Sequence, residues 1–161
     1  MKHLYAPWRS QYIQANQTSN ACVFCTQATT TQDKQHFIIK RYEHCFLVLN
    51  LFPYNPGHLL VIPYEHQASL ELLPRAARHE LMDVITHAIQ ILTKELKAQG
   101  FNVGVNLGGK AAGGSIPDHL HMHVLPRYQG DTNFLVTLAE TKQISANLLE
   151  LYEKLKIAFE N

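Results

Sequence analysis

Apolar residues in the first half of the chain fall mainly in three short runs, at residues 36–40, 44–50 and 58–63. Each run has the length of a strand, is rich in β-branched or aromatic residues and is bounded by turn-forming residues, so each predicts a β-strand. The residues before the first run, up to Gln35, are rich in Gln, Asn and Thr and predict irregular structure.

The hydrophobic period lengthens between Pro74 and Gly100, where apolar residues recur every three or four positions. This spacing predicts an amphipathic helix that begins near Pro74 and is closed by Gly100 in a left-handed conformation. A second stripe of this kind predicts a C-terminal helix at about residues 145–159, with Ser145 as its N-cap.

Alternation returns in residues 101–107 and 119–125, on either side of a glycine-rich stretch, and these two runs predict an antiparallel hairpin. The order of elements is then β-β-β-α-β-β-α, which favours an α+β fold with an antiparallel sheet over a parallel βαβ sheet. A chain of 161 residues has the usual size of one domain, so residues 1–161 are predicted to form a single domain.

The composition, 46% hydrophobic and 17% charged, is that of an ordinary globular protein, and no apolar run approaches the ~18 residues of a membrane span. The 14 Lys and Arg residues nearly balance the 13 Asp and Glu residues, so no global field attracts nucleic acid or an acidic membrane. We therefore expect a cytoplasmic protein that holds any anionic partner in a local site.

Three histidines alternate with apolar residues in the last predicted strand. Successive side chains on a strand point to opposite faces, so His119, His121 and His123 should share one side while the residues between them face the core. One interpretation is a metal-binding β protein that uses these histidines together. The other is covalent catalysis, because a neutral imidazole is a competent nucleophile toward phosphorus.

The run from His119 to Leu125 has the form His-φ-His-φ-His-φ-φ, and Asn50 stands eight residues before His58 at the start of an apolar strand. With these two features the chain resembles the histidine triad (HIT) family of nucleotide hydrolases and transferases. The resemblance covers a core of about residues 22–134. It implies a HIT-like fold with a five-stranded antiparallel sheet, one long helix and a C-terminal helix, a small-molecule nucleotide as substrate, and a homodimer.

The resemblance also implies catalytic roles for four histidines. His121 matches the nucleophile that attacks the α-phosphorus and carries a covalent nucleotidyl group, and His123 matches the histidine that contacts the leaving group. His119 and His58 match residues that support the nucleophile and close the phosphate site.

Four further residues are predicted to bind the nucleotide. By resemblance, Asn50 meets the ribose hydroxyls and Asn106 contacts phosphate. Gly114 and Ser115 lie in a glycine-rich stretch, where backbone N–H groups can approach phosphate oxygens without a Cβ in the way.

The stretches at residues 100–108, 112–117 and 126–134 resemble the bacterial diadenosine-tetraphosphate phosphorylase branch of the family. They favour phosphate as the acceptor that releases the nucleotide. Tyr128 departs from the tryptophan usual in that branch, which leaves open a hydrolase that uses water on dinucleoside polyphosphates or nucleoside phosphoramidates. A nucleotide-binding module with little turnover is a third alternative. A divalent ion such as Mg²⁺ can accompany the substrate, but the mechanism does not require it.

Cys22 and Cys25 form a Cys-x-x-Cys pair, which suggests a metal pair or a redox pair. Some HIT proteins place zinc on such a pair together with two histidines, and His66 and His119 stand at the corresponding positions here. The resemblance thus implies a structural Cys₂His₂ zinc site, because all four ligands come from the protein.

Overall fold

The computed structural model describes residues 21–112, 116–132, 144 and 146–160. In chain order, their elements are helix α2 (Val23–Thr29), strands β1 (Ile38–Arg41), β2 (Cys45–Leu49) and β3 (Leu59–Pro63), the 3-10 turn η1 (Leu70–Leu72), helix α3 (Arg75–Leu96), strand β4 (Gly100–Gly104), the 3-10 turn η2 (Gly109–Ala112), strand β5 (Met122–Arg127) and helix α5 (Leu148–Glu160). Among these residues, no helix is long and apolar enough to cross a membrane.

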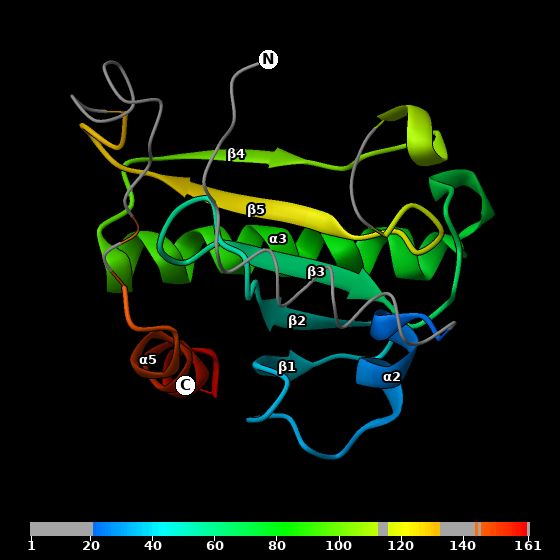
Figure 1. The fold of residues 1–161 in the computed structure, drawn as a ribbon, viewed down its shortest axis with the longest axis horizontal. Coiled ribbons are helices and arrows are strands. Elements are labelled where there is room, and N and C mark those ends of the chain that lie inside the picture. The colour runs from blue at the N-terminus through cyan, green and yellow to red at the C-terminus, as the bar shows by residue number, and fades with distance from the viewer. Residues whose placement is uncertain (1–20, 113–115, 133–143, 145, 161) are drawn as a thin grey trace.

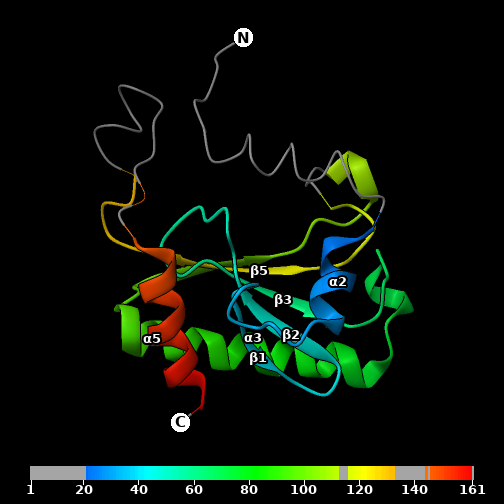
Figure 2. The same cartoon turned by 60° about the horizontal axis from the view of Figure 1, so that its bottom comes forward.

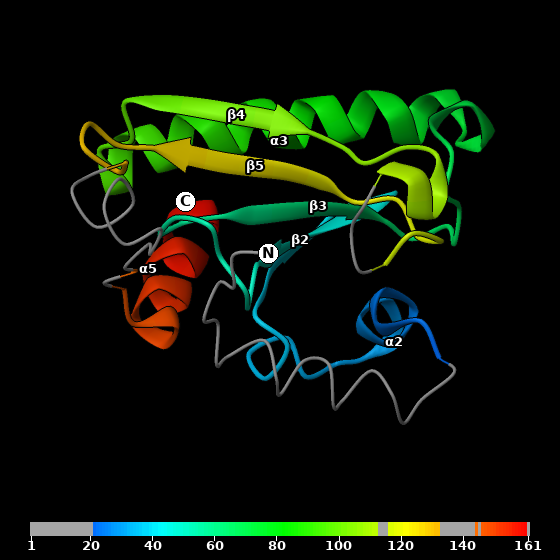
Figure 3. The same cartoon turned by 45° about the horizontal axis from the view of Figure 1, so that its top comes forward.

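The five strands form one antiparallel sheet in the order β1-β2-β3-β5-β4. The α+β fold and the predicted hairpin are confirmed, since β4 and β5 pair along their lengths. Strand β5 lies between β3 and β4, with β4 at the edge of the sheet (Figure 3). This strand order places His123, the last of the three alternating histidines, beside β3, the strand that follows His58.

Both faces of the sheet carry a hydrophobic core. On one face, Leu59 and Val61 of β3 pack with α3, which runs along the length of the sheet (Figure 1). On the other, Leu60 and Ile62 pack with Phe24 of α2. Because helices cover both faces, β2 and β3 are buried at every position and appear in the sequence as continuous apolar runs.

Helix α5 packs beside β1, at the opposite end of that strand from α2 (Figure 2). The Tyr152 hydroxyl donates to the Ile38 carbonyl oxygen at 3.2 Å, and the Lys156 ammonium donates to the Ile39 carbonyl oxygen at 2.8 Å. The Asn147 side chain caps the helix by accepting the Leu149 N–H at 3.0 Å. Ser145, the predicted cap, lies outside the described residues.

Three local predictions are corrected. The segment 23–29 is helical, although it was predicted to be irregular, because the packing of Phe24 stabilises a helix too short to show a period of its own. Lys97, with φ 56° and ψ 34°, closes α3 in place of Gly100, which instead begins β4. The final strand begins at Met122, so His119 and His121 lie just before it.

Candidate active site

His58 and His123 come from neighbouring strands. Strand β3 pairs with β5 so that Leu60 lies opposite His123, and His58 immediately precedes β3. The antiparallel register therefore brings the two imidazoles together, with His58 Nε2 and His123 Nδ1 2.9 Å apart.

The hydrogen bonds of His58 define its tautomer. Its Nδ1 accepts from the Tyr54 backbone N–H at 3.2 Å and from the Asn50 amide at 3.1 Å. The Asn50 side-chain oxygen accepts the Phe52 N–H at 3.0 Å, so the amide nitrogen is the end that faces His58. A neutral imidazole carries one proton, so His58 Nε2–H donates to His123 Nδ1, and His123 carries its own proton on Nε2.

His121 is oriented by the chain that precedes it. Its Nδ1 lies 2.9 Å from the His119 backbone oxygen. Because a carbonyl oxygen can only accept, His121 Nδ1 carries the proton and Nε2 keeps its lone pair. The centroid of the His121 ring lies 5.1 Å from that of His123. A free lone pair on one imidazole beside an N–H on another is an arrangement suited to nucleophilic attack with protonation of a leaving group.

Burial lowers the pKa of each of these histidines. Together with the neighbouring imidazoles, it lowers the pKa of His58 to about 3 and that of His123 to about 4. The pKa of His121 and that of His119 are also lowered, again chiefly by burial. His58 and His123 therefore keep an unprotonated ring nitrogen under mildly acidic conditions.

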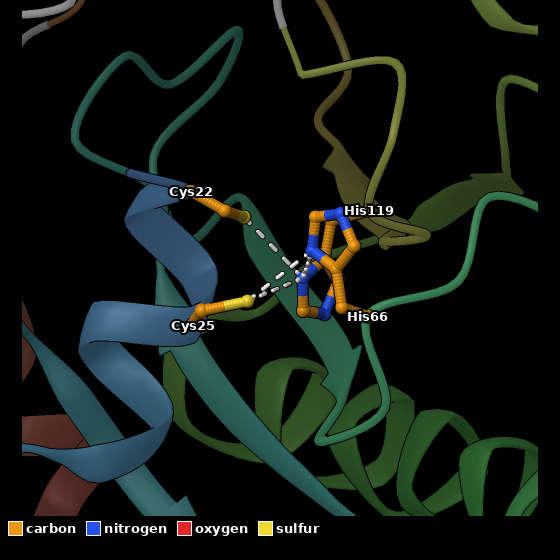
Figure 4. A group of neighbouring side chains, drawn as sticks. All are labelled: Cys22, Cys25, His66 and His119. Atoms are coloured by element: carbon orange, nitrogen blue, oxygen red, sulfur yellow. Dashed lines mark hydrogen bonds between the residues drawn. The ribbon is translucent and has the colours of Figure 1, made fainter. Parts of the chain in front are cut away.

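A second cluster joins α2 to the start of the histidine run. The side chains of Cys22 and Cys25 point from α2 toward His66 and His119 (Figure 4). The four ligand atoms lie within 4.8 Å of one another. His119 Nε2 donates to the Pro63 carbonyl oxygen at 2.9 Å, so its Nδ1 lone pair is directed into the cluster.

Four of the six distances between ligand atoms in this cluster are close to those of a tetrahedral metal site. The Nδ1 atoms of His66 and His119 are 3.2 Å apart, and Cys22 Sγ lies 3.4 Å from His119 Nδ1. Cys25 Sγ lies 3.2 Å from His66 Nδ1 and 3.6 Å from His119 Nδ1. Four ligands at zinc bond lengths in a tetrahedron are separated by about 3.3–3.8 Å. The Pro63 carbonyl is the kind of outer partner that fixes a metal-binding imidazole.

Both ring nitrogens of His119 are thus engaged, one in the cluster and one by Pro63. Its backbone oxygen, rather than its ring, contacts His121. Among the described residues, ligand atoms converge in the Cys22, Cys25, His66 and His119 group, and the three alternating histidines do not form such a group by themselves. The interpretation of the histidine run as one metal site is therefore not favoured.

Sequence reasoning missed Phe24. This side chain is 5% exposed and packs between the two histidines, with ring centroids 5.5 Å from His119 and 5.0 Å from His121. Phe24 lies between Cys22 and Cys25 in the sequence, so the segment that holds the two candidate ligands also makes a hydrophobic contact with His121. The sequence did carry a signal for this contact, because Phe24 is an aromatic residue between Cys22 and Cys25 in an otherwise polar segment.

The predicted nucleotide-binding residues are less closely grouped. Asn50 lies beside His58, whereas Asn106 is exposed between β4 and η2, and among the described residues no hydrogen bond joins it to a histidine. Gly114 and Ser115 lie outside the described residues. Arg127 pairs with Asp131, with Nε to Oδ2 at 2.6 Å.

The structure is thus an antiparallel α+β fold with two hydrogen-bonded histidines where β3 meets β5. Comparison with known proteins finds relatives of the histidine triad class that the sequence resembles. The chain matches the HIT domain family over residues 31–130. It is 36% identical over 151 residues to an AP-4-A phosphorylase of Mycobacterium tuberculosis, covering 89% of this chain and 77% of that one. An asymmetrical bis(5'-nucleosyl)-tetraphosphatase of Schizosaccharomyces pombe is 34% identical over 106 residues, 65% of this chain and 57% of that one.

Among solved structures, a Zn-bound histidine triad family protein from Mycobacterium smegmatis superposes with a TM-score of 0.70 and 28% identity, covering 87% of this chain and 94% of that one. The chain belongs to the HIT family, and it is an enzyme of that family, of the nucleotide hydrolase or phosphorylase kind.

Proposed function

We propose that the protein cleaves a dinucleoside polyphosphate of the diadenosine-tetraphosphate type through a covalent nucleotidyl group on His121. The observation that carries this proposal is the hydrogen bond from His121 Nδ1–H to the His119 carbonyl oxygen, which leaves Nε2 free to attack. The relative named AP-4-A phosphorylase supports the choice of substrate class.

In the first step, His121 Nε2 forms a bond to the α-phosphorus as the bond to the bridging oxygen breaks. His123 Nε2–H is the donor for that oxygen, because its Nδ1 already accepts from His58. In the second step, the acceptor attacks the same phosphorus, the P–N bond breaks, and His123 takes up the acceptor's proton. One positioned imidazole thus serves as nucleophile and then as leaving group.

We propose inorganic phosphate as the acceptor, as the resemblance to the phosphorylase branch implies, with Asn50, Asn106, Gly114 and Ser115 binding the nucleotide. Water is the alternative, and it has its own support in the relative named a tetraphosphatase. A phosphate acceptor releases a nucleoside diphosphate, whereas water releases a monophosphate.

One experiment tests both steps. The enzyme is mixed with diadenosine tetraphosphate, with and without phosphate, and quenched during turnover. Mass spectrometry should find an adenylyl group on His121, and product analysis should find ADP with ATP when phosphate is present. The matched control is His79→Asn, an exposed histidine of α3, which should keep full activity. An active His121→Asn enzyme would rule out the covalent route, and AMP with ATP in both conditions would establish hydrolysis.

We also propose that Cys22, Cys25, His66 and His119 hold a structural zinc ion. The donor set and its spacing fit tetrahedral zinc, and the Zn-bound relative supports the assignment. When bound, the ion would link α2 to His119 and so to the carbonyl that orients His121. Metal analysis should find one zinc per chain, and Cys25→Ser, which replaces a thiolate ligand, should lose most of it. Retention of zinc by this variant would contradict the ligand set.

The homodimer implied by the family resemblance remains part of this proposal. Strand β4 is the edge strand, and its Val103 side chain is 42% exposed. The long helix α3 carries Met82, which is 53% exposed. Light scattering of the purified chain should give twice the mass of one 18.3 kDa chain. The cytoplasmic location expected from the sequence likewise stays a prediction.

A further inference from the structure

The loop before His58 is tied to the far end of β5 by a buried amide. Asn55 is 1% exposed, and its side-chain nitrogen donates to the Pro126 carbonyl oxygen and to Asp131 Oδ2, both at 2.8 Å. The Asn55 backbone oxygen accepts the His58 N–H at 3.1 Å. A single residue therefore connects the strand that carries His123 to the backbone of His58.

Asp131 is the centre of these contacts. Besides Asn55, its carboxylate accepts from Arg127 Nε at 2.6 Å, Arg127 Nη2 at 2.9 Å, the Tyr128 N–H at 3.2 Å and the Thr132 hydroxyl at 3.2 Å. Its side chain is 8% exposed. The bonds from Arg127 hold the pKa of this carboxyl well below its usual range, so it remains a carboxylate.

Tyr128 makes a second tie to the same loop, because its hydroxyl donates to the Pro56 carbonyl oxygen at 2.9 Å. Arg127 is itself held by Asn102 of β4, with Nη1 to Oδ1 at 2.8 Å. Two adjacent residues of the loop that leads into His58, Asn55 and Pro56, are thus fixed to the end of β5 and, through Asp131 and Arg127, to β4. None of these contacts involves a histidine ring; the bond to His58 is made by its backbone N–H.

We propose that Asp131 is a positioning residue for the His58–His123 pair. By holding the loop through Asn55, it keeps His58 Nε2–H directed at His123 Nδ1, which places the proton of His123 on Nε2. This inference rests on the proposed function, in which that proton goes to the leaving oxygen. A looser loop allows the other tautomer of His123, which has no proton to give on that side.

The variant to test is Asp131→Asn. Every acceptor site of the carboxylate faces a donor, so whichever way the new amide turns, its NH₂ group meets an N–H or O–H and the contacts loosen. Rates are measured on a series of aryl esters of AMP whose phenols differ in acidity. Acidic phenols leave without a proton, whereas weakly acidic phenols depend on His123.

We expect the rate of Asp131→Asn to fall by less than about threefold for the most acidic phenol and by roughly tenfold or more for the least acidic one, up to the 10²–10⁴ that a general acid contributes in full. The slope of rate against leaving-group pKa is therefore steeper in the variant. A purely structural loss would lower all rates by one factor and leave the slope unchanged, and that result would overturn the proposal.

Asp33→Asn is the matched control, because Asp33 also pairs with an arginine, Arg41, through Nε at 3.0 Å and Nη2 at 2.8 Å, and among the described residues no hydrogen bond joins this pair to His58 or His123. Its slope should equal that of the unchanged enzyme. Should Asp131→Asn fail to fold, Tyr128→Phe removes only the bond to Pro56 and should steepen the slope in the same direction; an unchanged slope there overturns the proposal. Failure of the unchanged enzyme to turn over any ester would count against the proposed function instead.

Discussion

Among individual residues, the central contact is the hydrogen bond between His58 Nε2 and His123 Nδ1, which are 2.9 Å apart and share one proton. A second proton on either ring would place a buried charge beside another imidazole, and the lowered pKa values, about 3 and about 4, reflect that cost. Burial also lowers the pKa of His121. The hydrogen bonds of the neutral rings therefore decide which ring nitrogen of His58 and of His123 carries the proton.

This burial should make stability fall as the pH is lowered. Between about pH 6.5 and pH 3, an unfolded His58 binds a proton and the folded His58 does not, so folding is disfavoured progressively across that window. The contribution of His58 is at most about 1.4 kcal/mol per pH unit. Urea unfolding between pH 5 and 7 measures it, and His58→Gln should show a shallower dependence on pH. Equal slopes in the two proteins would contradict it.

At the scale of elements, the loop before β3 meets the end of α3 at Gly57. Gly57 has φ +83°, and a Cβ there would lie 2.6 Å from Leu96 Cδ1 and 3.1 Å from Leu92 Cδ2. A side chain is thus excluded twice, once by the left-handed backbone and once by the helix. Because Gly57 immediately precedes His58, this close contact between loop and helix helps to fix the position of the His58 backbone at the start of β3.

Gly57→Ala should therefore lower the free energy of unfolding by about 2–4 kcal/mol, the sum of backbone strain and overpacking. Gly108→Ala is the control, since Gly108 has φ +97° and a Cβ added there would meet nothing within 4 Å, so only the strain of ~1–2 kcal/mol should be seen. Denaturant unfolding of both variants gives the difference. Equal losses would mean that the contact with α3 costs nothing.

At the scale of the whole molecule, two layers of side chains enclose the sheet, and α5 completes the larger of them. Leu151, Tyr152, Leu155 and Phe159 of α5 belong to the same core as α3 and strands β2 and β3. The C-terminal helix therefore contributes to this core, and its loss would expose both the core and the backbone of β1.

Leu155→Ala should cost about 2–5 kcal/mol of unfolding free energy, because the side chain is fully buried and its removal leaves a cavity. Leu149→Ala provides a control on the same helix with the same chemical change, but at a site that is 48% exposed, and should cost less than about 1 kcal/mol. Thermal or denaturant unfolding measures both. A similar loss at the two positions would show that Leu155 of α5 does not pack into the core.

The sequence by itself determined the periodic elements and the chemistry they carry. The helix over Arg75–Leu96 and the strands around His58 and His123 follow from apolar spacing, which local geometry converts directly into faces. The residues of the cysteine and histidine cluster were likewise predictable by resemblance, and the structure brings all four together.

Only the tertiary structure decided how these groups act on one another. The helix that carries Phe24 is stabilised by packing and not by its own period. Lys97 ends α3 although Gly100 is the better left-handed residue, since Gly100 already lies in β4, where it pairs with Arg127. The proton positions of His58 and His123 depend on partners 65 positions apart. Sequence specifies which groups are present, whereas hydrogen-bond direction depends on where the folded chain places each donor and acceptor.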